Sequence, residues 1–496
     1  MSDVVIPGSR LDAGSGLTSA HAEPSSGGGQ LMGRVGAASV VLTVMAFLAP
    51  LGAIAGYVPL VIGYGNGLGA PAIFLMCGLI TALFSFGFLA LVRQVPRPGA
   101  FYAYISAGLG KRVGLGSGAL TLVMYVISLG SFMIFGGISL SSLLQRGLGI
   151  TAPWWACVIA MTLVVGFCSY RGIDFNVRVL GCIVTVEVAI ILLFDLAALR
   201  FGLHTHLPTQ PFTWNAFHSG SIAVAALFAI AFFIGFESTA IYREEVKNPS
   251  RTIPLATYIV TAVIAIFYAV AAYCLISVLG ADTVVSATAA DPSGSFTVAF
   301  SRVLGHSLAQ IVSVLVVTSV LASQLASTNG ITRYVYSFGV DRVLPRGLGA
   351  VHDRHGSPHR AAVAATVLTA AVVLAVALSG MDAQVAYGVF SGVAVYGFEV
   401  LMLLVSLAVI VYFIRHRGTG ESLWSTLIAP LLSIGAFGWL LIVSAQSADL
   451  LLGTPTPLTP VLFAVLAAAF IAGVGYASWS ALRRPDTYAR IGRAIA

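Results

Sequence analysis

Charged side chains are scarce in this sequence: Asp, Glu, Lys and Arg make up only 9% of the 496 residues, whereas 58% are hydrophobic. A soluble chain of this size carries roughly 25% charged residues, so the deficit argues against a soluble enzyme and a disordered protein. The five cysteines form no C-x-x-C pair and have no histidine at metal-ligand spacing, which excludes a disulfide scaffold and indicates small packing residues. The composition is that of an integral membrane protein.

Alternation of apolar and polar residues with period two is also missing. Each apolar run exceeds the roughly 10 residues of a barrel strand, so the spans are predicted to be helices. Residues 1–33, rich in Gly and Ser, have no apolar run after a basic start and predict a disordered cytoplasmic tail. The twelve predicted spans lie near residues 37–64, 70–92, 115–145, 154–170, 178–200, 220–241, 254–280, 305–328, 361–379, 385–414, 424–446 and 458–482.

The basic residues are distributed unevenly between alternate loops. Of the 25 Lys and Arg, all but Arg146, Arg200 and Arg302 fall on the side that holds both termini. This positive-inside bias predicts that both termini are cytoplasmic and that the protein lies in the cytoplasmic membrane. The net charge of +7 then reflects loops that face anionic membrane lipid, and it does not point to nucleic acid.

Glycine and proline cluster in two of the spans. The first span contains Pro50, Gly52, Gly56 and Pro59, and residues 49–59 are predicted to unwind near mid-membrane. The sixth span carries Gly235 beside a short polar cluster. Broken backbone survives in a membrane only where it faces protein or a water-filled cavity, so paired interruptions predict a binding site. The alternative is that these residues only allow close packing or kinks.

Matching breaks in spans one and six predict two five-helix halves, inverted with respect to each other. The predicted organisation after the N-terminal tail is a first inverted repeat at 34–203 (helices 1–5), a second at 204–416 (helices 6–10), helices 11 and 12 at 417–483, and a cytoplasmic tail at 484–496.

Several motifs resemble the amino acid/polyamine/organocation (APC) superfamily. Residues 233–238 (FIGFES) and 244–254 (EEVKNPSRTIP) are similar to its sixth helix and the following loop. Residues 96–104 (PRPGAFYAY) resemble its second loop, and 329–333 and 341–345 its eighth. The resemblance implies an all-α, leucine-transporter-like fold of the bacterial amino acid permease type, with a central site between helices one, three, six, eight and ten.

The resemblance also implies which residues contact substrate. Amides of the unwound first helix would bind a substrate carboxylate, and carbonyls of the sixth would bind its amine, as expected for helix ends. Carried over by position, the first-helix contacts are Leu51, Gly52, Ala53 and Ile54. The sixth-helix contacts are Ala231, Phe232, Ile234 and Gly235, with Phe232 or Phe233 as a gate.

Four acidic residues fall within spans: Glu187, Asp195, Glu237 and Glu399. Glu187 stands where many superfamily members have a lysine whose ammonium replaces a sodium ion, and it lies roughly 12 Å into the membrane. A charged carboxylate is costly there, so Glu187 is predicted to carry the coupled proton, with Glu399 as a second coupling candidate. Glu237 is predicted to cap freed amides and assist gating. The alternative for Glu187 and Glu399 is a neutral acid bonded to a carbonyl, and for Asp195 a position at the interface.

Other polar residues give weaker signals. Ser323, Ser327 and Thr328 would complete a sodium site against the first helix, but such hydroxyls are also routine packing contacts. His352, His355 and His359 are better interpreted as part of a solvated loop than as metal ligands. No metal or other cofactor is predicted.

The sequence therefore predicts a secondary active transporter that imports an amino acid or related organic amine by alternating access and proton symport. The alternatives are an exchanger for amino acids or polyamines, or a sodium-coupled symporter. An acidic cavity would favour a cationic amine. A membrane enzyme is disfavoured because no H-E-x-x-H or G-x-S-x-G motif is present. A channel would repeat a short selectivity loop in several subunits, and a nutrient sensor remains an alternative. Monomer and homodimer are both left open.

Overall fold

The computed structural model describes residues 41, 44–45, 48–95, 100–171, 177–205, 207–237, 239, 246, 248–352, 358–446 and 458–491. The predicted tail at 1–33, the start of the motif at 96–104, most of the loop at 240–247 and His355 lie outside this part of the chain.

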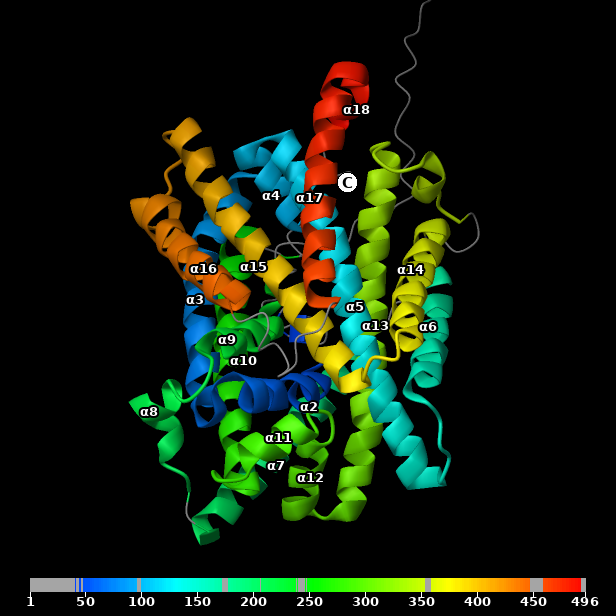
Figure 1. Ribbon diagram of the computed structural model, residues 1–496. Helices are drawn as coiled ribbons and strands as arrows, with labels where there is room; N and C mark the ends of the chain where they lie inside the picture. Colours follow the sequence, from blue (N-terminus) through cyan, green and yellow to red (C-terminus); the bar gives the residue numbers. More distant parts are fainter. Residues whose placement is uncertain are drawn as a thin grey trace, which may run out of the picture.

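The described residues form a bundle of helices (Figure 1). The predicted first half contains α2 (Pro50–Leu60), a π-helical segment η1 (Val61–Asn66), α3 (Ala70–Gln94), α4 (Ala100–Leu109), α5 (Lys111–Leu148), α6 (Trp154–Tyr170) and α7 (Val177–Thr205). The predicted second half contains α8 (Trp214–Phe217), α9 (Ile222–Ile230), a 3-10 turn η4 (Ala231–Phe233), α10 (Pro249–Leu279), α11 (Val284–Ala290), α12 (Ser295–Leu304), α13 (His306–Val340), α14 (His359–Leu378) and α15 (Ala383–Arg415). It is followed by η7 (Trp424–Ile428), α16 (Ala429–Gln446), α17 (Leu458–Arg483) and α18 (Pro485–Arg490).

Nine helices among the described residues are long and apolar enough to cross a membrane. One of these stretches, Pro50–Gln94, includes part of the first predicted span and all of the second. Two shorter apolar helices follow: Trp154–Tyr170 coincides with the fourth predicted span, and Ile222–Phe233 covers the first part of the sixth, predicted at 220–241. The chain is thus an integral membrane protein, and the total of twelve spans stays a prediction.

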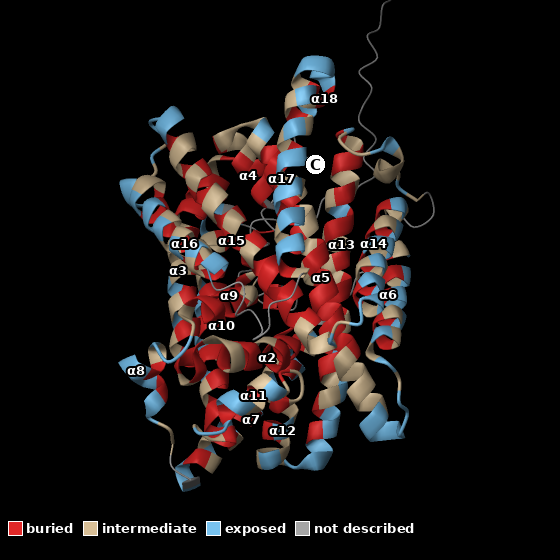
Figure 2. Cartoon of the chain, viewed as in Figure 1, coloured by how far each residue is buried: buried red, intermediate tan, exposed pale blue. Residues whose placement is uncertain are grey.

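Helix α5 forms the centre of the bundle. It packs against α4, α6, α13, α15 and α17, and 72% of its most apolar stretch is buried, compared with 22% for the peripheral α17. Figure 2 shows the same contrast, with buried residues concentrated on α5 and exposed residues along α17. Apolar side chains such as Leu79 and Leu378, 72% and 79% exposed, lie on the outside of the bundle. Such a surface is stable only in contact with lipid.

The π-helical segment η1, at the end of the first span, packs against the start of the sixth span. The Ser221 amide at the beginning of α9 donates a hydrogen bond to the Gly65 carbonyl at 3.1 Å. A Cβ atom on Gly65 would lie 2.7 Å from the Ala225 Cα, so only glycine allows this approach. The two spans that the sequence predicts to be broken are therefore packed together.

Candidate functional site

The first break lies at Ala49. This residue adopts a left-handed conformation, with φ 47° and ψ 71°, and α2 begins at the next residue, Pro50. The prediction that residues 49–59 unwind is therefore wrong in extent, because proline at the first helical position loses no hydrogen bond and starts a helix readily. Leu51, Gly52, Ala53 and Ile54 form the first turn of α2.

The second break lies where the sequence predicts it. Helix α9 ends at Ile230, η4 follows, and the chain is then extended at Ile234, with φ −65° and ψ 122°. Gly235 has φ 105°, a conformation that residues with a side chain rarely adopt. The backbone of the sixth span is thus interrupted at 234–235.

Glu187 of α7 is bound to the first break. Its Oε2 accepts a hydrogen bond from the Leu51 amide at 3.2 Å, and the Gly52 amide donates to Ser319 Oγ of α13 at 3.3 Å. The first amides of a helix have no partner within it and attract negative charge. The carboxyl group of Glu187 and the hydroxyl of Ser319 therefore supply those partners, and three helices meet at this point.

Glu237 is bound to the second break. The Gly235 amide donates to Glu237 Oε2 at 2.9 Å, and the Tyr125 hydroxyl of α5 donates to Oε1 at 2.9 Å. The position agrees with the predicted cap of a freed amide, whereas the predicted role in gating is a functional property and stays a prediction.

A small cavity of about 70 Å³ lies between the two breaks. Its volume is below the roughly 300–1,000 Å³ of ordinary ligand pockets, so a substrate enters it only if neighbouring side chains move. Ser323 and Ser327, predicted as sodium ligands, line it, and Thr328 does not. The lining residues are Leu48, Ala53, Tyr57, Tyr125, Ser128, Leu129, Phe132, Ala231, Phe232, Ile234, Ser323, Gln324 and Ser327.

Half of the predicted substrate contacts line this central cavity. Ala53, Ala231, Phe232 and Ile234 do so. Leu51, Gly52, Ile54 and Gly235 do not, and the amides of Leu51 and Gly52 bond to side chains instead. Because α2 is helical from Pro50 onwards, successive residues point in different directions and only one face of the first turn reaches the cavity.

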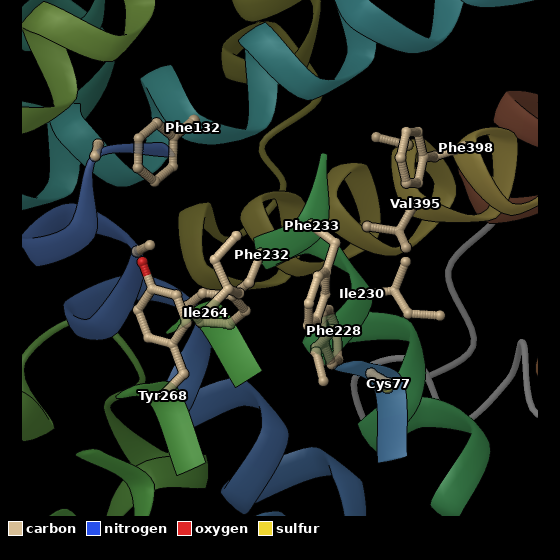
Figure 3. Packing of buried hydrophobic residues seen from close by; sticks show 14 of the residues in the cluster. Cys77, Phe132, Phe228, Ile230, Phe232, Phe233, Ile264, Tyr268, Val395 and Phe398 are labelled. Atoms are coloured by element: carbon tan, nitrogen blue, oxygen red, sulfur yellow. The ribbon is translucent and has the colours of Figure 1, made fainter. Parts of the chain in front are cut away.

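The two candidate gate residues point to different surroundings. Phe232 lines the central cavity, and its ring lies 5.8 Å from that of Tyr57 and 4.1 Å from that of Tyr268. Phe233 is fully buried and points away from Tyr268, towards Phe228 (Figure 3). The geometry favours Phe232 as the residue that a substrate would displace.

The other two intramembrane acids lie outside the central cavity. Glu399 on α15 is fully buried, and neither carboxylate oxygen has a hydrogen-bond partner among the described residues. Asp195 on α7 is 4% exposed and also lacks a partner for either oxygen in this part of the chain. Its alternative position at the membrane interface concerns depth in the bilayer and stays a prediction. An unpaired carboxylate charge is costly inside a membrane, so both positions suit a carboxyl group that holds a proton.

Several cavity residues were not identified from the sequence. Gln324 donates from Nε2 to the Leu129 carbonyl at 2.7 Å. A polar amide side chain within an apolar helix is rare, so the sequence did contain a signal for this residue. Tyr57, Tyr125 and Phe132 carry no such signal, because aromatic residues are common throughout membrane helices. Among the described residues, no group of three His, Cys, Asp or Glu could hold a metal ion.

Comparison with known proteins identifies relatives over most of the chain. The sequence profile of a family described as "Amino acid permease" matches residues 32–476. The methylthioribose transporter of Bacillus subtilis is 24% identical over 74% of this chain and 78% of its own length. The low-affinity putrescine importer PlaP of Escherichia coli is 26% identical over 64% of this chain and 70% of its own.

A solved structure gives the fold. The crystal structure of a mutant form of the Eremococcus coleocola manganese transporter superimposes with a TM-score of 0.57 at 13% identity and covers 90% of this chain and 95% of its own. At this identity the likeness shows the fold alone, which is the all-helical, leucine-transporter-like class that the sequence predicts.

Proposed function

We propose, from the premise that the chain belongs to the amino acid permease family, that this membrane transporter imports an amino acid or related organic amine by alternating access. The two interrupted spans carry the proposal, because their breaks at Ala49 and Ile234–Gly235 lie beside one cavity. Both termini are proposed to be cytoplasmic, in line with the distribution of Lys and Arg.

The chemistry of the central cavity supports an amine-containing substrate. Tyr57, Phe132 and Phe232 offer aromatic faces that attract a cation. Glu237 lies one hydrogen bond away from the cavity residue Tyr125. The relative named for putrescine is consistent with this class of substrate.

Glu187 is the proposed proton carrier. Its Oε2 accepts from the Leu51 amide, and a carboxylate holds such an amide more strongly than a neutral acid does. Protonation would therefore loosen the hold of α7 on the first turn of α2, and loss of the proton would restore it. Proton movement and the position of the first span are coupled in this way.

The test is uptake by proteoliposomes. A thermal-shift screen of amino acids and amines first identifies a ligand, because bound ligand stabilises the folded protein by mass action. With that ligand, Glu187→Gln should abolish uptake driven by a pH gradient while ligand binding persists. Asp282→Asn, at an exposed turn, is the control and should transport normally. Undiminished pH-driven uptake by Glu187→Gln would contradict the assignment.

Sodium coupling is the second candidate, because Ser323 and Ser327 line the cavity. If uptake is coupled to protons, replacing sodium by choline in the buffer should leave it unchanged. Uptake that stops after this replacement would favour coupling to sodium. An exchanger would instead show counterflow in the absence of any ion gradient.

A further inference from the structure

A second and larger cavity, here called the outer cavity, lies at the end of the bundle opposite the C-terminal helix α18. It has a volume of about 780 Å³ and is formed by the end of α5, by α12, by the start of α13 and by Gln384 at the start of α15. This volume is within the range of ordinary small-molecule sites. In the proposed orientation it faces the outside of the cell.

The outer cavity collects positive charge that is otherwise rare on this side. Arg146 at the end of α5 and Arg302 at the end of α12 both line it, together with His306. These are two of the three Lys or Arg residues that the sequence places in outer loops, and the third, Arg200, does not line it. Two arginines from separate helices can bind a carboxylate through charge-assisted hydrogen bonds.

Hydrogen-bond acceptors, among them a negatively charged carboxylate, line the same cavity. Asp291 Oδ1 accepts from the Gly294 amide at 3.0 Å and from the Ser293 hydroxyl at 3.2 Å. Gln384 Nε2 donates to Ser293 Oγ at 2.5 Å and so holds Ser293 beside this carboxyl group. The hydrogen bonds named for Asp291 end on Oδ1, and its carboxylate carries the negative charge that an ammonium group requires.

We propose that the outer cavity is a second binding site for a zwitterionic amino acid. Arg146 and Arg302 bind the carboxylate, Asp291 binds the ammonium, and the apolar Ile138 and Leu143 lie beside the substrate side chain. This inference rests on the proposed function, and it narrows the substrate to molecules that carry both charges.

The outer cavity adjoins the central one through α2. Ala55 lines the outer cavity, whereas Ala53 and Tyr57 of the same helix line the central cavity. An amino acid held in the outer cavity is therefore separated from the central cavity by the width of one helix. The outer site would capture substrate before the central cavity opens.

Binding stoichiometry tests the proposal. Equilibrium dialysis of the purified full-length protein with each labelled L-amino acid should reveal one that binds as two molecules per chain. The double variant Arg146→Gln/Arg302→Gln should bind only one molecule of that amino acid per chain, and so should Asp291→Asn. Arg200→Gln is the matched control and should bind two. Arg146→Lys/Arg302→Lys keeps both positive charges and should still bind two molecules per chain. This result would show that the glutamine variant loses the second molecule because the charges are gone and not because the protein is misfolded.

Uptake gives an independent measurement. Loss of charge-assisted contacts in Arg146→Gln/Arg302→Gln should raise KM by about tenfold and leave the maximal rate unchanged. Two bound molecules in that variant, or an unchanged KM, would overturn the outer site. A lipid is the other possible ligand of the two arginines, and phosphatidylglycerol added in detergent tests it. The outer site would also be overturned if phosphatidylglycerol, and no amino acid, raised the melting temperature of the wild type but not that of Arg146→Gln/Arg302→Gln.

The outcomes separate this proposal from the proposed function. Two bound amino acids without uptake would support the outer site and contradict transport. Uptake restricted to amines that lack a carboxylate would support transport and contradict the outer site. Absence of any amino acid binding and any uptake would contradict both.

Discussion

Neighbouring side chains in the sixth span have different surroundings, and Phe232 and Phe233 illustrate this most clearly. They are neighbours in the chain, yet Phe232 lines the cavity and Phe233 is fully buried in the apolar packing. The 3-10 turn places adjacent side chains on different sides. Sequence position alone could not separate the residue that lines the cavity from the packing residue.

The two phenylalanines should respond differently to truncation. Phe233→Ala should lower the free energy of unfolding by about 3–5 kcal/mol, as expected for a large cavity in a packed core. Phe232→Ala should mainly change the KM of uptake, because its ring borders the central cavity, the proposed substrate site. Thermal unfolding and proteoliposome uptake measure the two effects. A larger loss of stability in Phe232→Ala than in Phe233→Ala would contradict this assignment.

At the scale of the element, the interruption of the sixth span depends on one backbone conformation. Gly235 has φ 105°, and its amide binds Glu237. Gly235→Ala should cost about 1–3 kcal/mol of stability and reduce uptake. Gly475→Ala in α17 is the control, since a Cβ there meets open space and alanine favours a helix interior. Equal melting temperatures for the two variants would show that the break is not strained.

Asp341, directly after the end of α13, is a titratable group near the charge of Arg490 on α18. Burial raises the pKa of the Asp341 carboxyl to about 6, and the charge of Arg490 on α18 opposes this rise. A raised pKa in the folded state means that this group adds stability at low pH, and the contribution is lost as the pH rises through about 6.

Asp341→Asn removes this pH dependence, because asparagine does not titrate. Between pH 4 and pH 7 the melting temperature of the wild type should fall relative to that of Asp341→Asn. Asp282→Asn, at an exposed turn, should follow the wild type. A constant difference between wild type and Asp341→Asn across this range would contradict the prediction.

At the scale of the whole molecule, the proposed orientation in the membrane follows from the distribution of basic residues. Gly147 at the end of α5 lies on the predicted outer side, and Gly418 between α15 and α16 lies on the predicted inner side. A membrane-impermeant maleimide should therefore label Gly147→Cys in intact cells and should label Gly418→Cys only after the cells are permeabilised. The reverse labelling pattern would overturn the proposed topology. The unsubstituted protein is the control, because it measures how strongly the native cysteines are labelled.

Composition, periodicity and backbone breakers were sufficient for the membrane class, the helical fold and the place of the break in the sixth span, because each depends on local chemistry. They were not sufficient for the extent of the break in the first span, because Pro50 starts a helix there. The partners of the breaks were decided only by tertiary structure. Glu187 and Ser319 reach the first turn of α2 from helices 136 and 267 residues away in sequence. Asp195 is buried because α10 lies beside α7, and the outer cavity exists only where the ends of α5, α12 and α13 come together. Contacts between distant segments depend on how helices pack, and a linear pattern of residues carries no direct record of that packing.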